Sequence, residues 1–270
     1  MLKSCLRGLK IYFYMVGVSI KTQLQYRYAF VMNILGWAMT YAGTAITMWV
    51  MLYSFGSIRG WTFWELLFLF ALAVLSWSIT MVLFFHFHNM DEYIVEGTFD
   101  RFLVRPIHPF LHVIALKFDV GAFGQLLFSI VAMIIAYVQL KLNWQFYQWL
   151  VFLGAIIGGT LIQGSMLVLI SAAAFWTTRS ERLFWALMWP ARNLMNYPLT
   201  VFPRFIQLLV TFLLPFAFVN FLPALTLLDK TKESFDPFWG FFSLPVGIAF
   251  FAICFKIWNL GLDHYKSAGS

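Results

Sequence analysis

A short charged segment, residues 91–109 (DEYIVEGTFDRFLVRPIHP), interrupts two long apolar runs. It holds four acidic residues, two arginines and two prolines, with Phe99 and Phe102 placed between the charges. Carboxylates beside histidines are the groups that bind metals or transfer protons, whereas charges alternating with aromatic rings are typical of a surface that docks on another protein. The spacing of the residues decides between these kinds of chemistry.

Four histidines flank this segment, and their spacing disfavours a metal site. His108 and His112 are four apart, as in a helical zinc pair, but the intervening residues lack the glutamate that would act as a base. Pro109 favours a helix start at that point over a helix interior. His86 and His88 are two apart and would point to different faces of a helix. We therefore assign no metal ligands and no catalytic residues, and nothing in the sequence arranges Ser, His and Asp as a triad.

The charged segment instead predicts two short helices. Asp91, Glu92 and Glu96 lie on the first helix, Gly97 can end it in the left-handed conformation, and Thr98 is placed to cap the second. The second is amphipathic, because the apolar residues recur at steps of three and four; its apolar side holds Phe99, Phe102 and Leu103, its charged side Asp100, Arg101 and Arg105, and Pro106 and Pro109 stop it.

Two interpretations of this amphipathic helix stay open. Its aromatic side would fill a groove in a partner protein while its charges set the register. Alternatively, the segment is a solvated loop whose phenylalanines pack on the ends of the protein's own helices.

The composition requires a membrane to surround these elements. The chain of 270 residues is 62% hydrophobic and 11% charged, against roughly 25% charged for a soluble domain. Its mean hydropathy is +0.81. Several uncharged runs reach the about 20 residues that a helix needs to cross the hydrocarbon core, and they lack the short alternating segments of a membrane barrel. The fold class is therefore an all-α polytopic membrane protein.

Six transmembrane helices are predicted, in a single domain over residues 1–270, five of them at about 30–55, 63–85, 116–138, 149–176 and 238–260 and one more within 183–228. Residues 1–28 carry a basic and polar stripe and predict an amphipathic helix in the membrane interface. Glycines at 154, 158 and 164 would let a neighbouring helix approach closely. The region 183–228 is ambiguous, because prolines interrupt both of its apolar runs; if both spanned, the crossings would number seven.

The distribution of basic residues gives the orientation. In the six-helix arrangement twelve lie on one side, namely Lys3, Arg7, Lys10, Lys21, Arg27, Arg101, Arg105, Lys117, Arg179, Arg182, Lys256 and Lys266. Four lie on the other, namely Arg59, Lys141, Lys230 and Lys232. Since Lys and Arg accumulate on the cytoplasmic side, both termini and the charged segment are expected in the cytoplasm. The basic residues form no single soluble patch, so no nucleic acid partner is expected.

Residues 96–110 (EGTFDRFLVRPIHPF), preceded by two spans and a basic interfacial helix, resemble the loop after the second helix in permease subunits of type-2 ABC exporters. The pattern Gly-hydrophobic-Asp-x-x-Leu-x-Arg-Pro is similar to that of a six-helix subfamily often labelled as drug or viologen export permeases. Residues 196–228 also resemble that subfamily's proline-punctuated segment, in which a fifth helix gives way to short re-entrant helices on the outer side.

This resemblance implies a permease that exports a hydrophobic, amphipathic or cationic compound across the bacterial inner membrane. It implies a second permease subunit, identical or related, and separate ATPase subunits that hold ATP and Mg, since the chain has no GxxxxGK[ST] loop and is expected to bind no cofactor itself. Residues 86–110 would be the cytoplasmic coupling loop and 203–237 the outer re-entrant segment. The implied coupling residues are Glu92, Glu96, Gly97, Phe99, Asp100, Arg101, Phe102 and Arg105.

The same resemblance places residues 183–202 in the membrane as the fifth span, with Arg192 near its centre. A charge there is costly, so Arg192 and its neighbour Asn193 are candidates for a translocation path. The other interpretation is that Arg192 reaches the interface beside a break at Pro190. Two further functions stay open for the whole chain, namely an ion-driven secondary transporter and a membrane scaffold that transports nothing.

Overall fold

The structure is a computed structural model and describes residues 27–105, 108–114, 121–177, 181–231 and 235–265. Across these residues the regular structure is helical, and the only β pairing is one isolated bridge between Ile58 and Trp61. Five stretches are long and apolar enough to cross a membrane. They are built on α2 (Arg27–Phe55), α3 (Phe63–Phe84), α7 (Gly121–Gln139), α8 (Phe146–Thr177) and α13 (Ser243–His264).

Short helices connect these spans. Between α3 and α7 they are η1 (Phe85–Asn89), α4 (Met90–Val95), α5 (Asp100–Leu103) and α6 (Pro109–Ile114). Between α8 and α13 they are α9 (Glu181–Leu183), η2 (Phe184–Met188), α10 (Trp189–Leu194), η3 (Leu199–Val201), α11 (Arg204–Leu208), η4 (Leu209–Leu213), η5 (Phe216–Phe218), α12 (Phe221–Leu227) and η6 (Pro237–Phe242).

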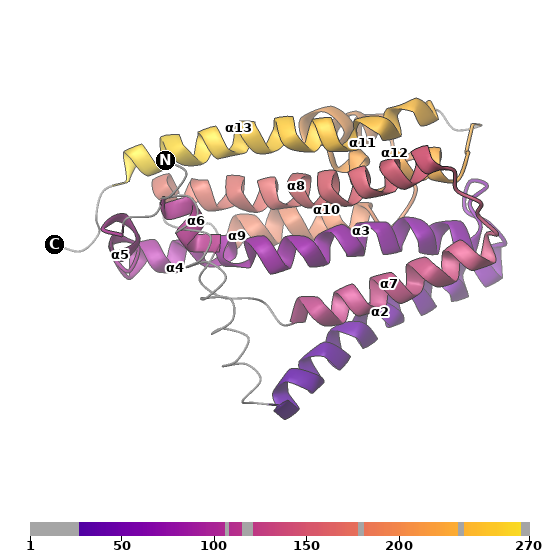
Figure 1. Ribbon diagram of the computed structural model, residues 1–270, viewed down its shortest axis with the longest axis horizontal. Helices are drawn as coiled ribbons and strands as arrows, with labels where there is room; N and C mark the ends of the chain where they lie inside the picture. Colours follow the sequence, from indigo (N-terminus) through magenta and orange to yellow (C-terminus); the bar gives the residue numbers. More distant parts are fainter. Residues whose placement is uncertain (1–26, 106–107, 115–120, 178–180, 232–234, 266–270) are drawn as a thin grey trace.

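The long helices run along the longest axis of the molecule, and α8 lies between α13 and α3 (Figure 1). α7 packs against α3 and α2, while α2 splays away from α3 toward its first residues. We call the two ends of this bundle the α5 end, which holds α4, α5 and α6, and the α12 end. At the α12 end the Trp144 indole donates a hydrogen bond of 3.2 Å to the Leu227 carbonyl.

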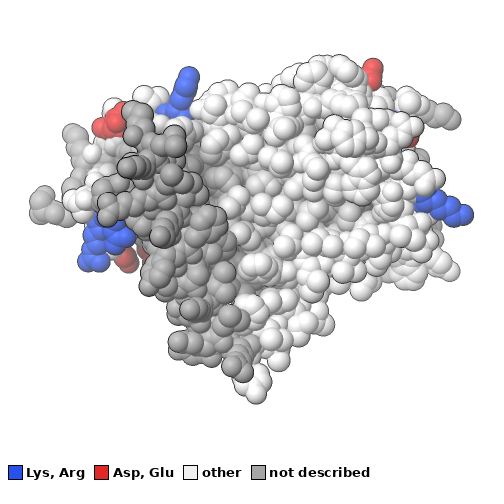
Figure 2. All heavy atoms as spheres, viewed as in Figure 1, with Lys and Arg blue, Asp and Glu red and all other residues white. Residues whose placement is uncertain are grey.

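Charged side chains gather at these two ends. On the face shown in Figure 2, Lys, Arg, Asp and Glu lie toward the left and right ends, and the atoms between them that are not grey are white. This separation is the arrangement that a bilayer imposes, because ionised groups are costly in hydrocarbon. The all-α polytopic membrane fold is therefore confirmed.

The contact between α8 and α13 depends on glycine, as predicted for Gly158. A Cβ added at Gly247 would lie 2.7 Å from the Gly158 carbonyl oxygen, closer than real Cβ atoms come. A Cβ at Gly158 would meet the backbone of Ser243 in the same way. The two backbones touch, which is how membrane helices gain packing energy where lipid removes the hydrophobic driving force.

The predicted first, second, fourth and last spans agree with α2, α3, α8 and the 237–264 stretch within a few residues. The third begins at Gly121 as described, and residues 115–120 lie outside the described part. The fifth prediction, 183–202, is wrong as a continuous helix. Helical structure over 181–194 ends at Leu194, because Pro198 lacks a backbone N–H and restricts the residue before it.

The chain beyond this helix is bent. Residues Arg204–Leu213 and Phe216–Leu227 would pass as one span by composition, but they meet at an angle of 79°. Pro215 stands at the break. This geometry is that of a broken span or a re-entrant loop, in line with the predicted segment 203–237. The predicted interfacial helix at 1–28 falls almost wholly on residues 1–26, which lie outside the described residues.

Candidate functional site

The loop between α3 and α7 folds back on the bundle at the α5 end. Gly97 has a φ of +68°, the left-handed conformation that separates α4 from α5, as the sequence predicts. The predicted cap by Thr98 is wrong, since its hydroxyl donates to the Tyr93 carbonyl at 3.3 Å and accepts no bond from the first turn of α5. Glu96 follows the last residue of α4 and is exposed.

Phe99 anchors α5 to the bundle. Its side chain is 0% exposed, and its ring centroid lies 5.0 Å from that of Tyr265, 5.5 Å from Phe175 and 5.6 Å from Phe102. These contacts are edge-to-face, the favourable geometry for aromatic pairs. Phe102 is also buried. The chain itself therefore covers both rings, and the prediction that they fill a groove in a partner is wrong in this conformation.

Asp100 is also engaged within the chain. Its Oδ1 accepts a hydrogen bond of 3.0 Å from the Tyr265 hydroxyl, directly after the last turn of α13. This bond and the Phe99 contacts join α5 to the ends of both α8 and α13. The predicted coupling residues thus divide into a buried set, Phe99 and Phe102, and a group that reaches solvent.

The solvent-facing part of the loop carries both apolar and charged side chains. Val104 is 85% exposed, Val95 63% and Leu103 43%. Four charged residues of the same loop are also exposed, namely Glu92, Glu96, Arg101 and Arg105. We call these seven residues the docking face. The charges of this face were predicted from the sequence, whereas Leu103 was grouped with the two phenylalanines and neither valine was predicted.

His112 lies under this loop. It is 2% exposed, and its ring centroid is 4.6 Å from that of Phe102. Burial, with a smaller effect of the positive charge on Arg105, lowers the pKa of the imidazole below its ordinary value. No group of three or more His, Cys, Asp or Glu that could hold a metal ion occurs within the described part of the chain.

A second group of candidate residues lies inside the bundle around Arg192, in the last turn of α10. The centre of its guanidinium is 4.2 Å from the centroid of the Trp77 ring on α3 and 5.9 Å from those of Tyr41 and Trp189. It donates a hydrogen bond of 2.5 Å to the Tyr41 hydroxyl. Tyr41 and Trp77 belong to transmembrane spans, so the charge lies at membrane depth.

Such a charge carries a cost of roughly 2.5–3.5 kcal/mol on insertion scales, which cation–π contacts of about 0.5–2 kcal/mol offset in part. Arg192 is half-buried and lies against Tyr41 and Trp77 within the bundle, whereas a translocation path along it stays a prediction. Asn193, its predicted companion, is exposed and does not share this cluster. A π-helical turn, η2, precedes Pro190. Because Pro190 has no backbone N–H, it cannot donate the helical hydrogen bond to the preceding turn.

Polar side chains that sequence reasoning missed lie between α3 and α8, and one of them, Gln163, lines a cavity with Arg192. Gln163 on α8 is 0% exposed and donates 2.8 Å to Ser76 Oγ and 3.3 Å to the Gly159 carbonyl. The Thr80 hydroxyl on α3 donates to the Thr160 carbonyl on α8 at 3.2 Å, and the Thr160 hydroxyl donates to the Ser76 carbonyl on α3 at 3.2 Å. A glutamine inside an apolar run was the available signal, because uncompensated polar groups are rare in spans.

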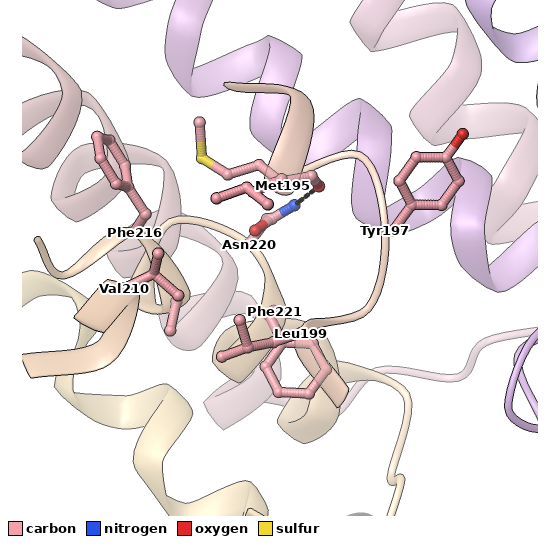
Figure 3. Close-up of a pocket in the computed structure, with 9 residues that line it drawn as sticks. Met195, Tyr197, Leu199, Val210, Phe216, Asn220 and Phe221 are labelled. Carbon is pink, nitrogen blue, oxygen red and sulfur yellow. Dashed lines mark hydrogen bonds between the residues drawn. The ribbon is translucent and has the colours of Figure 1, made fainter. Parts of the chain in front are cut away.

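Asn220 fixes the end of α10. Its side-chain amide donates to the Met195 carbonyl at 2.6 Å and to the Leu69 carbonyl of α3 at 3.2 Å, and the residue is 1% exposed. Figure 3 shows it beside a cavity of about 20 Å³ with mostly apolar walls, which include Val210, Phe216 and Phe221. The bent segment is thereby held against α3 and α10.

The bent segment is also held at the α12 end. Lys230 Nζ lies 3.0 Å from Glu65 Oε1 and donates to the Gly60 carbonyl at 3.0 Å. The same ammonium lies 4.5 Å from the centroid of the Trp61 ring. These contacts hold the residue Lys230 against the start of α3 and the turn before it, at the end of the bundle opposite the docking face.

Comparison with known proteins gives one family. The family model described as "ABC-2 family transporter protein" matches residues 38–269, which is most of the chain. Comparison with the curated proteins and with the solved structures gave no match.

Proposed function

The chain belongs to the ABC-2 family of transporter proteins, and we propose that it is the membrane-spanning permease subunit of an ATP-driven exporter. It lacks the GxxxxGK[ST] loop that cradles nucleotide phosphates, so ATP and Mg fall to separate ATPase subunits. Its cargo is a hydrophobic or amphipathic compound that a bundle of apolar helices can accommodate. The membrane is the bacterial inner membrane, with the α5 end in the cytoplasm.

The docking face is the observation that carries this proposal. Val95 and Val104 are exposed among charged residues of a solvent-facing loop, and a docking surface combines apolar side chains with charged ones in this way. Val104 and Leu103 would enter a groove in the ATPase. Glu92, Glu96, Arg101 and Arg105 would set the register of the two surfaces.

The buried side of α5 would transmit movement of the ATPase subunits to the transmembrane helices. Closure of the ATPase subunits on ATP displaces α4 and α5, and the interlocked rings of Phe99, Phe175 and Tyr265 pass that displacement to the ends of α8 and α13. Packed aromatic groups transmit force because close-packed interiors are weakly compressible. α3 moves as well, because η1 joins it to α4 without a loop.

A second permease subunit, identical or related, completes the path. Only 11% of the α2 window is buried within the chain, compared with 83% for the stretch that includes α3. α2 is therefore free to face a second subunit. A half-buried Arg192 beside α2 disfavours lipid there and supports an interface or a polar path.

The test is purification of the tagged chain from its native host in mild detergent, followed by mass spectrometry of the proteins that accompany it. We expect an ATP-binding protein to accompany the unmodified chain. Val104→Asp and Arg101→Glu should each remove most of that protein, since one replaces an apolar side chain of the docking face by a charge and the other reverses one of its charges.

Arg59→Glu is the matched control, because Arg59 is exposed at the α12 end and undergoes the same charge reversal. It should retain the ATPase at the level of the unmodified chain. A stable chain that carries no ATP-binding protein in any variant contradicts the proposal and points to an ion-driven carrier or a scaffold.

A further inference from the structure

The Arg192 guanidinium has hydrogen-bonding capacity that the protein leaves unused. A guanidinium carries five N–H donors in a planar fork, and within the described residues the recorded acceptor is the Tyr41 hydroxyl. The ion pair between Lys230 and Glu65 at the α12 end is the one that the described residues form, and no carboxylate among them pairs with Arg192. An anion that accepts from these spare N–H donors would stabilise the guanidinium charge at membrane depth.

A small cavity adjoins this charge. Its volume is about 20 Å³, room for about one water molecule or one oxygen of a larger group. Arg192, Asn196 and Gln163 line it together with apolar residues of α3, namely Phe70, Ala73 and Val74. Both walls come from segments far apart in the sequence, so the cavity exists only in the folded bundle.

Gln163 gives an independent indication of a ligand. Its side chain is fully buried, and its amide nitrogen is satisfied by Ser76 and Gly159. Its Oε1 has no hydrogen-bond partner within the described structure. Buried acceptors in native proteins are nearly always paired, so we expect this oxygen to accept a hydrogen bond from a bound ligand. Arg192, with spare donors, and Gln163, with this unpaired acceptor, thus line the same cavity.

We propose that Arg192, Gln163 and Asn196 form a binding site for the oxyacid headgroup of an anionic amphiphile. One headgroup oxygen accepts from the Arg192 guanidinium, and a protonated headgroup oxygen or its water donates to Gln163 Oε1. A monoalkyl phosphate carries both kinds of oxygen. The apolar part of the ligand extends from the half-exposed side of Arg192, toward α2 and α10.

This inference rests on the proposed function and names the class of its cargo. It favours an anionic amphiphile over the cationic compound that the family resemblance implies. The Trp77 face is covered by Arg192 at 4.2 Å, so it cannot serve a second cation there. A cationic compound would also meet a like charge in the cavity.

The test measures saturable binding of radiolabelled dodecyl phosphate to the full-length chain in phosphatidylcholine nanodiscs, with empty discs subtracted. We expect dodecyl phosphate to bind and dodecyltrimethylammonium, with the same apolar chain, to show no saturable binding. Arg192→Gln should weaken dodecyl phosphate binding about tenfold or more, because a hydrogen bond to a charged group is lost. Arg204→Gln, an exposed arginine outside the cavity, should bind as the unmodified chain does.

Equal binding of both amphiphiles to the unmodified chain overturns the inference, and this comparison needs no variant to fold. Undiminished binding by Arg192→Gln overturns it too. Addition of phosphatidic acid to the discs identifies the source of the headgroup: competition supports a membrane lipid as the occupant, and its absence supports a cargo that enters from water. Copurification of the ATPase, measured on the same preparations, separates failure of this site from failure of the permease assignment.

Discussion

The Tyr265 hydroxyl donates a hydrogen bond of 3.0 Å to Asp100, and this bond joins the end of the last transmembrane helix to the first residue of α5. The two residues are 165 positions apart in the sequence. Their contact makes the loop between α3 and α7 part of the bundle. A displacement of α5 would therefore be transmitted directly to the end of α13.

Tyr265→Phe should lower the free energy of unfolding by about 0.5–1.5 kcal/mol, the net value of one hydrogen bond, while the ring contact with Phe99 persists. Unfolding by sodium dodecyl sulfate, followed by circular dichroism, measures this change. Tyr53→Phe is the matched control, because that tyrosine is 82% exposed, and it should change stability little. Equal effects of the two substitutions would refute a stabilising role for the Asp100 contact.

Phe99→Ala should destabilise the chain by about 3–5 kcal/mol, since it empties a fully buried aromatic site at which three rings meet. Val104→Ala, at 85% exposure, should stay within about 0.5 kcal/mol of the unmodified chain. The same denaturation assay checks both values. If Phe99→Ala proves as mild as Val104→Ala, the ring does not anchor α5.

Gly247→Ala should separate α8 from α13 and cost about 1–3 kcal/mol, because the added methyl group would overlap the backbone at Gly158. Gly43→Ala supplies the contrast, since a Cβ there meets nothing within 4 Å. Alanine is also the better helix former, so Gly43→Ala should be neutral or stabilising. Thermal unfolding of the two variants side by side distinguishes close packing from a general intolerance of alanine.

Acidification should weaken the fold through His112. Its pKa is lowered in the folded chain, so between that value and the unfolded value of about 6.5 the unfolded state binds more protons. Stability is therefore fully present above about pH 6.5 and declines as the pH falls below it. His112→Phe removes this contribution. The free energy of unfolding should therefore fall less steeply from pH 7.5 to 5.5 in the variant than in the unmodified chain. Identical slopes would show that His112 stays uncoupled from folding.

The sequence predicts the elements at the α5 end better than their contacts. Gly97 between two charged helices was sufficient to indicate a left-handed turn, because few residues other than glycine adopt it readily. The partner of Phe99 was not predictable, since α5 has four residues and offers too short a periodicity to show which protein covers its apolar side. Tyr265 carried no signal at all.

The membrane region shows the same division. Uncharged runs locate α3 and α8, because length and hydropathy alone determine a span. The region after α8 does not form such a span, since Pro198 and Pro215 divide it into helical pieces that are too short to cross the membrane. Arg192 was identified by its cost in the membrane, but Gln163 became noticeable only when folding placed its unpaired oxygen beside that arginine.

The central claim is that an ATPase subunit contacts the docking face, and site-specific photo-crosslinking tests it in intact cells. A benzophenone amino acid at position 104 would label whatever protein touches that face, and mass spectrometry would identify the adduct. Position 146, where Phe146 is 78% exposed at the α12 end, serves as the control. We predict an adduct with an ATP-binding protein from position 104 and none from position 146. The absence of that adduct at 104, or its equal formation at 146, would contradict the account.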